Sequence, residues 1–368
     1  LLPVLFFILV YVKKKSKSTY RKKPYLRNLF FVGTLFGFGF YLSGIFWVAY
    51  SLTFDESFKI LIPFTIILIP LFLSIFTGLT TIAVGQFLSY NFSSILLFSG
   101  FFSLADYVRG KILSGFPWNL WSYSWSWLNE ALQVLNLVGL YAYNLLVITI
   151  FMLPAVLFFN IRLSKKILIT SLTFLFIFLI YIYGTFSINK NRAVLNYIND
   201  NQKIYTKVIS PNFELKYNVS LEEIEKRLKD LIKYSEPNDK KTTLFIWPEG
   251  VFTGYSFDEI SEFSYLIKEN FKKDHLIVLG INTVDKKTGD YFNSLIVVNN
   301  DFKILHQYDK KKLVPFGEFL PFEKILNKLG FKKITQGYVS FTKGKISNNI
   351  SINNLNILPL ICYEIIFP

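Results

Sequence analysis

The pattern of hydrophobic positions changes near residue 187. Before that point long apolar runs dominate the chain, and after it short apolar segments alternate with charged ones. A helix needs about 20 consecutive apolar residues to cross a bilayer. Short strands that alternate with amphipathic helices instead favour a layered α/β domain. The pattern therefore predicts a polytopic α-helical membrane domain over residues 1–187 and an α/β domain over residues 188–368.

Five segments of the first domain are predicted to span the membrane. They are residues 30–52, 60–88, 95–107, 132–160 and 167–186, and the third is the weakest. Residues 1–12 are apolar but too short to span. Their positive charges follow the apolar run, whereas those of a signal peptide precede it. We interpret residues 1–12 as the tail of a further helix.

Basic loops orient these spans. One cluster of Lys and Arg occupies residues 13–27, and a second occupies residues 162–166, four predicted crossings later. The positive-inside rule places both clusters on the cytoplasmic side. Arg109 and Lys111 fall on the outer side and count against this scheme. A fifth crossing then predicts that the chain after Asn189 lies outside, in the periplasm of a Gram-negative bacterium.

Short strands and helices alternate in the second domain. The predicted strands are residues 204–209, 244–247 and 276–280, and a predicted hairpin joins residues 293–298 to 303–308 through a turn at residues 299–301. Amphipathic spacing predicts helices over residues 221–234 and 257–271. Pro315, Gly317 and Pro321 indicate that the segment after Lys310 is a loop.

Composition narrows the partners and the chemistry. A hydrophobic content of 52% and a mean hydropathy of +0.38 are typical of membrane proteins. Much of the net charge of +15 sits beside apolar segments, where Lys and Arg meet anionic lipid headgroups, so we do not expect a nucleic-acid partner. One cysteine and two distant histidines supply neither a disulfide framework nor the ligands of a structural zinc site. Any chemistry must therefore come from carboxylates, lysines, hydroxyls or the thiol.

Three residues at the ends of predicted elements form a candidate catalytic set. Glu249 follows the strand 244–247, Lys310 follows the strand 303–308, and Cys362 follows the apolar run 358–361, which we predict to be a buried strand. Taken singly, Glu249 suits a turn, Lys310 is one of three adjacent lysines, and Cys362 suits a core. Taken together, a carboxylate base, an ammonium and a thiol suit nucleophilic catalysis, because the base removes the thiol proton and the ammonium stabilises a thiolate or an oxyanion.

The segment 115–127 is rich in aromatic residues. It contains Trp118, Trp121, Tyr123, Trp125 and Trp127. Indole and phenol rings concentrate where the bilayer meets water. The segment is predicted to be either a plain interfacial belt or part of a lipid-binding site.

Motifs around these residues resemble those of apolipoprotein N-acyltransferase, the membrane member of the nitrilase (carbon-nitrogen hydrolase) superfamily. The matching stretches are Trp247-Pro248-Glu249, residues 308–318 with the string Leu313-Val314-Pro315-Phe316-Gly317-Glu318, and Ile361-Cys362-Tyr363-Glu364. In the first domain Gly115-Phe116-Pro117-Trp118, Tyr123-Ser124, and Gly44 with Trp47-Val48 also look like the family. The resemblance covers nearly the whole chain and implies that the second domain is a nitrilase-like α/β sandwich.

The resemblance assigns roles to the three residues of the candidate set. It implies that Glu249 is the general base, Lys310 the oxyanion-stabilising lysine and Cys362 the nucleophile. Lys310 is chosen because the family lysine lies eight positions before Glu318.

Further residues match positions that support catalysis or bind substrate in the family. Glu318 matches an essential carboxylate near the triad, and Tyr363 and Glu364 match important residues beside the nucleophile. Tyr217 matches an aromatic residue on a substrate-gating loop, and Trp118 and Tyr123 match the lipid-binding region. Lys311 and Lys312 are expected to face solvent or lipid headgroups.

The family has a further membrane helix before the first residue of this chain, and the rest of the sandwich and a final membrane helix after Glu364. We therefore expect the sandwich to be incomplete at its C-terminal end, and residues 1–368 alone to be poorly active.

The resemblance implies a two-step acyl transfer that uses neither cofactor nor metal. Cys362 would take a fatty acyl chain from a phospholipid as a thioester, and the free N-terminal α-amine of the diacylglyceryl-cysteine of an apolipoprotein would accept it. The implied partners are these two substrates and membrane lipids, and the implied location is the bacterial inner membrane with the catalytic domain in the periplasm. Two alternatives are a membrane-anchored amidase that hydrolyses a small amide with the same residues and a non-enzymatic membrane scaffold.

Overall fold

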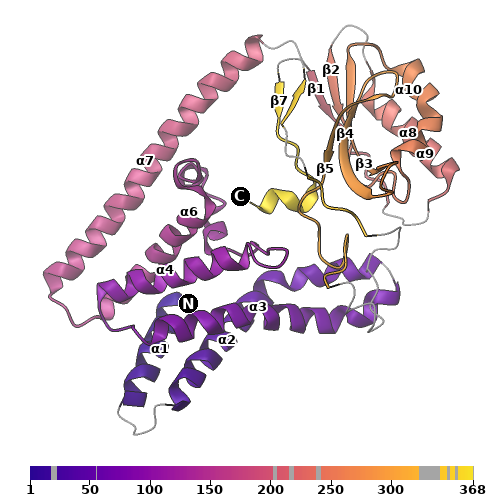
Figure 1. The fold of residues 1–368 in the computed structure, drawn as a ribbon. Helices are drawn as coiled ribbons and strands as arrows, with labels where there is room; N and C mark the ends of the chain where they lie inside the picture. The colour runs from indigo at the N-terminus through magenta and orange to yellow at the C-terminus, as the bar shows by residue number, and fades with distance from the viewer. Residues whose placement is uncertain are drawn as a thin grey trace. The chain divides into compact units, whose positions relative to one another are not determined.

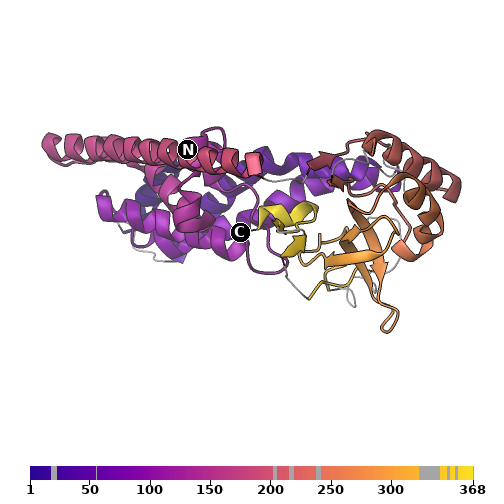
Figure 2. The same cartoon turned by 90° about the horizontal axis from the view of Figure 1, so that it is seen from above.

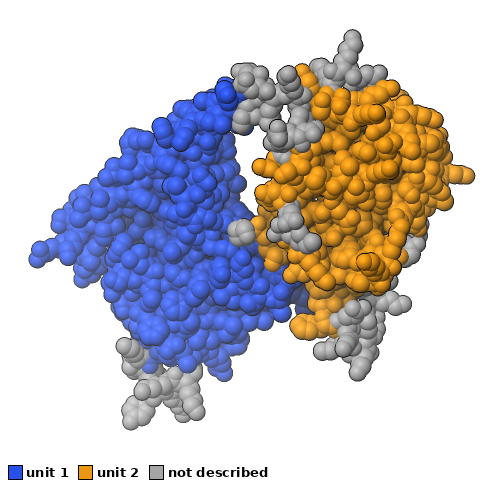
Figure 3. All heavy atoms as spheres, turned by 45° about the horizontal axis from the view of Figure 1, so that its top comes forward, with its two compact units in different colours: residues 1–197, 368 blue, residues 198–367 orange. Residues whose placement is uncertain are grey.

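The computed structural model consists of two compact units, residues 1–197 and residues 198–367 (Figure 3). It describes residues 1–17, 23–54, 56–201, 205–214, 219–237, 242–322, 340–345, 349–352 and 355–367. Each unit has hydrophobic clusters of its own, and the residues proposed above as a catalytic set belong to the second unit.

The first unit is helical (Figure 1). Its α-helices are α1 (Leu2–Lys17), α2 (Lys23–Ile45), α3 (Ile62–Gly85), α4 (Phe92–Arg109), α5 (Asn129–Leu132), α6 (Leu135–Met152) and α7 (Leu163–Asn201). Short 3-10 helices extend several of these: η1 (Phe46–Phe54), η2 (Glu56–Leu61), η3 (Trp121–Trp125) and η4 (Leu153–Phe158). Figure 2 shows α7 as one long, uninterrupted rod, and its 39 residues exceed the predicted span 167–186 at both ends.

Four segments of the described chain are long and apolar enough to cross a membrane. They are Tyr25–Thr53, Phe58–Gly85, Leu135–Phe158 and Leu163–Tyr197, and they coincide with four of the five predicted spans. The remaining prediction, residues 95–107, falls in α4, which has 18 residues and is not among them. Its length suffices, but four serines, Asp106 and Arg109 make α4 less apolar than the four segments above.

Arg109, at the end of α4, is buried and paired with Asp106. It is therefore not one of the exposed loop cations on which the positive-inside rule depends. Its side chain is 1% exposed, and Nη2 donates to Asp106 Oδ1 at 2.9 Å. Nη1 donates to the carbonyl oxygens of Phe116 and Trp118, both at 2.7 Å, and Asn144 on α6 donates to Asp106 Oδ2 at 2.9 Å. This network fastens the start of the aromatic segment to α4 and α6. Arg109 therefore does not weigh against the predicted orientation in the way that an exposed loop cation would.

Small residues allow α2 and α3 to pack closely. A Cβ atom placed on Gly33 of α2 would collide with the side chain of Thr81 on α3 and lie 2.9 Å from the carbonyl oxygen of Thr77. The Thr81 hydroxyl instead donates to the carbonyl oxygen of Leu29 at 2.8 Å. Small residues and interhelical hydrogen bonds are the usual means by which helices associate in membranes, where lipid tails are as apolar as the side chains.

The second unit is built on a five-stranded sheet in the order β1-β2-β3-β4-β5. The strands are β1 (Tyr205–Val208), β2 (Thr243–Ile246), β3 (His275–Val284), β4 (Tyr291–Val298) and β5 (Ile304–Asp309). The first three are parallel, and β3, β4 and β5 are antiparallel, so the predicted hairpin is confirmed. A two-stranded sheet of β6 (Ile350–Ile352) and β7 (Leu355–Ile357) follows.

Alternation of side chains along the strands gives the five-stranded sheet two apolar faces. Phe245 on β2 and Trp247 just after it point to one face, where they pack with Leu228 and Leu231 of α8 (Leu221–Ser235). Leu244 points to the other face, where it clusters with residues of β6 and β7. Figure 1 accordingly shows α8, α9 (Phe257–Ile260) and α10 (Ser264–Asn270) on one side of the sheet and β7 on the other. This is the layered α/β arrangement that the sequence predicts.

Two local predictions differ from the structure. The predicted helix 257–271 is broken into α9 (Phe257–Ile260), the 3-10 helix η5 (Ser261–Phe263) and α10 (Ser264–Asn270). At the break the Ser261 hydroxyl donates to the carbonyl oxygen of Asp258 at 2.6 Å, a local bond that competes with regular helix.

The predicted buried strand over residues 358–361 is also wrong. These residues are extended but outside any strand, and Leu358 and Leu360 are exposed while Pro359 and Ile361 are buried. Proline has no N–H to complete a strand ladder, which explains why the apolar run does not extend β7.

Gly33→Leu is expected to lower the free energy of unfolding by about 1–3 kcal/mol, the usual cost of overpacking. The control is Gly39→Leu on the same helix, because a Cβ atom at Gly39 meets no other group within 4 Å. The two variants share the change in helix propensity, so the difference between their Tm values in detergent measures the helix contact. Equal Tm values would contradict the close packing of α2 and α3.

Candidate active site

Glu249 lies in the turn that follows β2, at the carboxyl end of the parallel strands. The backbone N–H of Trp247 continues the sheet by donating to the Val278 carbonyl at 2.8 Å, and its indole donates to Ser235 Oγ at 3.0 Å. Gly280 on β3 lets the turn approach, because a Cβ atom at that position would lie 3.2 Å from the Cα atom of Glu249. The chain therefore brings Glu249 close to the central strand β3, on a well-anchored strand end.

Asn293 on β4 joins Glu249 to Glu318. Its Nδ2 donates to Glu249 Oε1 at 3.1 Å and to Glu318 Oε1 at 2.8 Å. An amide nitrogen carries two hydrogens, so both bonds can form at once. The Asn293 carbonyl oxygen also accepts the backbone N–H of Lys310 at 2.8 Å. One residue thereby sets the spacing of two carboxylates and the lysine.

Lys310 carries a buried charge that Glu318 neutralises. The lysine side chain is 1% exposed, and its Nζ donates to Glu318 Oε1 at 2.9 Å. Glu318 Oε2 accepts the backbone N–H of Val314 at 2.8 Å, which orients the carboxylate. Burying an ammonium without a partner costs several kcal/mol, and the ion pair with Glu318 offsets that cost for Lys310.

Glu364 ties the chain after Lys310 to the turn that holds the cysteine. Its buried carboxylate accepts hydrogen bonds from the backbone N–H groups of Lys311 at 2.7 Å, Lys312 at 3.0 Å and Ile361 at 3.0 Å. The Tyr308 hydroxyl donates to both of its oxygens at 3.0 Å. Burial and the neighbouring carboxylate raise the pKa of Tyr308, so this donor stays protonated. Two segments more than fifty residues apart are thus joined by one side chain.

Cys362 begins a short 3-10 helix, η6 (Cys362–Ile366), in a left-handed conformation with φ of 49°. Such a backbone is costly for a residue with a Cβ atom, and residues of this kind concentrate at functional sites. The side chain of Cys362 is exposed.

The charges of the site act on this thiol. Desolvation and then the negative charge of Glu249 raise the pKa of Cys362, with a smaller contribution from Glu318. The ammonium of Lys310 and the backbone N–H of Tyr363 lower that pKa, but the net direction is upward. The thiol is therefore protonated at neutral pH, and a base must remove its proton before or during attack.

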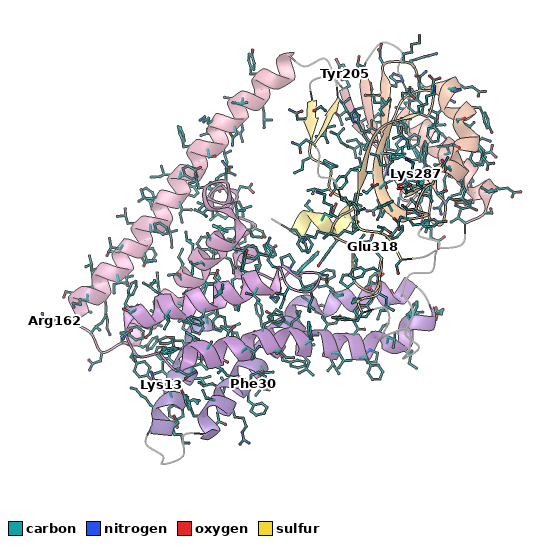
Figure 4. The ribbon with its side chains drawn as sticks, in the orientation of Figure 1. Lys13, Phe30, Arg162, Tyr205, Lys287 and Glu318 are labelled. Carbon is teal, nitrogen blue, oxygen red and sulfur yellow. The ribbon has the colours of Figure 1, made fainter. Side chains whose placement is uncertain are left out.

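The structure brings Glu249, Lys310, Glu318, Cys362 and Glu364 to the same end of the sheet. Figure 4 shows Glu318 at this end and Tyr205, the first residue of β1, at the opposite end. Tyr363 follows the cysteine, and its ring meets Phe367 edge to face at 5.0 Å.

Three predicted substrate-binding residues are not placed at this site. Tyr217 lies outside the described residues. Trp118 and Tyr123 belong to the first unit, where Trp118 packs on Trp47 at 5.1 Å and Tyr123 donates to the carbonyl oxygen of Pro117 at 3.3 Å.

Two residues of the site were missed in the sequence. The sequence indicates Asn293 only as the start of a hairpin strand and Tyr308 only as part of a motif. A polar amide within the apolar strand 291–298, and a tyrosine at the buried end of the next strand, are signals that point to both. No three acidic, histidine or cysteine side chains in the described part of the chain are arranged to hold a metal ion.

Comparisons with known proteins bear on both units. Residues 1–153 match the sequence model of the apolipoprotein N-acyltransferase N-terminal domain, and residues 211–368 match that of the carbon-nitrogen hydrolases. A crystal structure of an N-terminal amidase overlaps 30% of this chain and 28% of its own at 23% identity, with a TM-score of 0.22, too low to support an argument.

Relatives extend over nearly the whole chain. The apolipoprotein N-acyltransferase of Rhodopseudomonas palustris is 28% identical over 91% of this chain, which spans 64% of that relative's length. The apolipoprotein N-acyltransferases of Rickettsia typhi and Rickettsia prowazekii are each 30% identical over 99% of this chain and 70% of their own length. With both of its units matched and a curated family member aligned along almost all of its residues, this chain belongs to the apolipoprotein N-acyltransferase family.

Proposed function

We propose that the protein transfers a fatty acyl chain from a phospholipid to the free N-terminal α-amine of the diacylglyceryl-cysteine of apolipoproteins, through a thioester on Cys362. The observation that carries this proposal is the hydrogen-bond network that links Glu249, Glu318 and the buried Lys310, together with the bonds of Glu364 that hold the Cys362 turn to the chain after Lys310. Family membership supports the acyl donor and the acceptor.

In the first step Glu249 removes the proton of Cys362 as the sulfur attacks the acyl carbonyl carbon of the phospholipid. The tetrahedral intermediate carries an oxyanion, and the Lys310 ammonium stabilises it, as a fixed cation in a water-poor site is suited to do. The intermediate collapses to a thioester as the ester C–O bond breaks. Glu249 returns the proton to the departing oxygen, and a lysophospholipid leaves.

In the second step the α-amine of the apolipoprotein attacks the thioester carbonyl. Glu249 takes a proton from the amine, Lys310 again holds the oxyanion, and the C–S bond breaks to give the amide. The proton passes back to the sulfur, which regenerates the starting thiol. A thioester divides a difficult ester aminolysis into two easier steps.

The supporting residues hold this arrangement and do not react. Glu318 pairs with Lys310 and holds it in place, and Glu364 fixes the Cys362 turn to the backbone of Lys311 and Lys312. We assign Tyr363 a role through its backbone N–H, which acts on the sulfur.

We further propose that residues 1–187 form the membrane domain and residues 188–368 the catalytic domain, on the periplasmic side of the inner membrane. Four apolar segments long enough to span support the membrane assignment. A membrane domain would keep both lipid substrates at the bilayer surface, so that the acyl carbonyl meets the thiol without leaving lipid. Trp118, Tyr123 and Tyr217 remain proposed contacts for these lipids.

Incubation of the full-length protein with phospholipid is expected to produce an acyl adduct on Cys362, detected by mass spectrometry of the peptide. Cys362→Ser is expected to carry no thioester. Glu249→Gln is expected to slow adduct formation by a factor of about 10²–10⁴, the usual contribution of a general base.

A soluble small amide is the control substrate for this experiment. An enzyme that hydrolyses the amide and forms no adduct with phospholipid would be an amidase, which would overturn the proposal. A Cys362→Ala protein that still supports lipoprotein N-acylation in cells would leave the site without a catalytic role.

The pH at which Cys362 ionises is expected to move in opposite directions in two variants. Glu249→Gln removes a negative charge that raises the pKa of the thiol, so alkylation by iodoacetamide should begin at lower pH. Lys310→Met removes a positive charge that lowers the pKa, so alkylation should begin at higher pH. The sequence contains one cysteine, so the alkylation rate reports on Cys362. Shifts of the same sign in both variants would show that the two charges do not both act on this sulfur.

A further inference from the structure

Arg227 on α8 is buried, yet it uses all three of its nitrogen atoms. Its side chain is 3% exposed. Nη1 donates to the Val251 carbonyl at 3.0 Å, Nη2 to the Glu214 carbonyl at 3.0 Å, and Nε to Glu223 Oε1 at 3.2 Å. The guanidinium also lies over the ring of Phe213, with Cζ 5.3 Å from its centroid. These contacts join three separate segments of the second unit.

Apolar packing already holds α8 in the core without the hydrogen bonds of Arg227. The apolar face of α8 packs into the core through Ile224, Leu228 and Leu231, all fully buried. Arginine stays charged in proteins, so its burial is tolerated because the two carbonyl oxygens and one carboxylate satisfy it. The carboxylate of Glu223 is 39% exposed and lies on the same helix, so the contacts that reach beyond α8 are those to the backbone. The forked guanidinium of Arg227 therefore acts on the two segments whose carbonyl oxygens it binds, those of Val251 and Glu214.

One of those segments is the turn that carries Glu249. Val251 follows Glu249 by two residues, and Gly250 between them has a φ of +78°. Bonds within the turn, from Thr253 Oγ1 to the Gly250 carbonyl at 2.7 Å and from the Tyr255 N–H to the Phe252 carbonyl at 3.1 Å, fold it. Packing of Val251 and Phe252 in the core and the bond from Asn293 to the Glu249 carboxylate attach it to the unit. Arg227 adds a hydrogen bond to the backbone of the turn, at the Val251 carbonyl.

A second bond joins the same two regions. The Tyr255 hydroxyl donates to the Val219 carbonyl at 2.7 Å, at the chain segment that leads into α8. Glu214 and Val219 are thus both linked to the region around the Glu249 turn, one through Arg227 and the other through Tyr255.

We propose that Arg227 is a positioning residue for Glu249: its fork holds the Val251 carbonyl and so fixes the carboxylate at the distance from Cys362 at which it takes the thiol proton. Arg227 touches neither substrate nor sulfur. The inference rests on the proposed role of Glu249 as base. A lysine ammonium is a compact charge without the planar set of donors that lets arginine bind the Val251 and Glu214 carbonyls together. Arg227→Lys is therefore expected to disturb the turn although it keeps the charge.

The test measures the rate of Cys362 acylation by phospholipid vesicles against pH, in the full-length protein. Arg227→Lys and Arg227→Met are expected to acylate Cys362 more slowly than the wild type, by about 10- to 100-fold at neutral pH, because a small displacement of a catalytic group lowers the rate by about this factor. The deficit should shrink as the pH rises, because hydroxide in solution then deprotonates the thiol and Glu249 is no longer required for that step. Glu249→Gln should show the same recovery.

Leu228→Ala is the matched control for lost packing. Leu228 is the next residue on α8 and is fully buried, but it makes no hydrogen bond to the Glu249 turn through its side chain. This variant should lose folded protein, and its rate should fall by one factor at all pH values. An Arg227→Met deficit that is equally independent of pH, or no deficit, would overturn the inference.

Alkylation of Cys362 gives a reading that does not depend on acyl transfer. Glu249, Glu318 and Lys310 are the charges that act on this thiol. If Glu249 moves away in Arg227→Lys, the pKa of the thiol should fall toward its value in Glu249→Gln. An unchanged alkylation profile in folded Arg227→Lys would reject the positioning role. Absence of any phospholipid adduct on the wild type, together with a shifted alkylation profile, would instead reject the proposed function and leave the positioning of Glu249 in place.

Discussion

A buried ammonium is the constraint on which the rest of this site depends. Lys310 is almost fully enclosed, and it pairs at 2.9 Å with Glu318, whose second oxygen accepts a backbone N–H. Removing one partner of such a pair is far more costly than replacing both by apolar groups, since the remaining charge stays buried. Asn293, which binds Glu318 and Glu249 together, extends this constraint to the proposed base. The electrostatics of the site therefore form one connected system.

The carboxylate of Glu364 holds the backbone of the site in place. Glu364 accepts backbone hydrogen bonds from both sides of the site and so holds the left-handed turn of Cys362 beside the chain that follows Lys310. Hydrogen bonds to a charged acceptor are stronger than neutral ones, which suits a turn that is costly in itself. Arg227, a cation, holds the Glu249 turn in a similar way, by donating to the Val251 carbonyl. Each proposed reacting group thus stands on a turn that a buried ionic side chain holds.

Much of this arrangement could be predicted from the sequence, and particular elements show where prediction ended. The hairpin 293–308 and the helix α8 follow from the pattern of apolar positions, which indicates the buried face of an element. Four of the five membrane segments follow from the length of the apolar runs. The run before Cys362 has the same apolar character, yet its residues alternate between exposed and buried and lie outside any strand. Hydrophobicity alone does not reveal whether a neighbouring strand is present to pair with. Arg109 was read as an exposed loop cation, but it pairs with Asp106 one turn earlier on α4. Its burial, and the bond from Asn144 on α6 to Asp106, depend on tertiary packing that the sequence does not state.

The sequence by itself determined the two-part organisation, the apolar segments, and the identity of Glu249, Lys310 and Cys362 as candidates, because these depend on local pattern and on residues at the ends of elements. The tertiary structure decided which charges act together. The contacts of Asn293 with Glu249, of Lys310 with Glu318, of Glu364 with the chain after Lys310, and of Arg227 with Val251 join elements from different parts of the unit. Such pairings arise from strand order and helix packing, and no spacing along one segment encodes them.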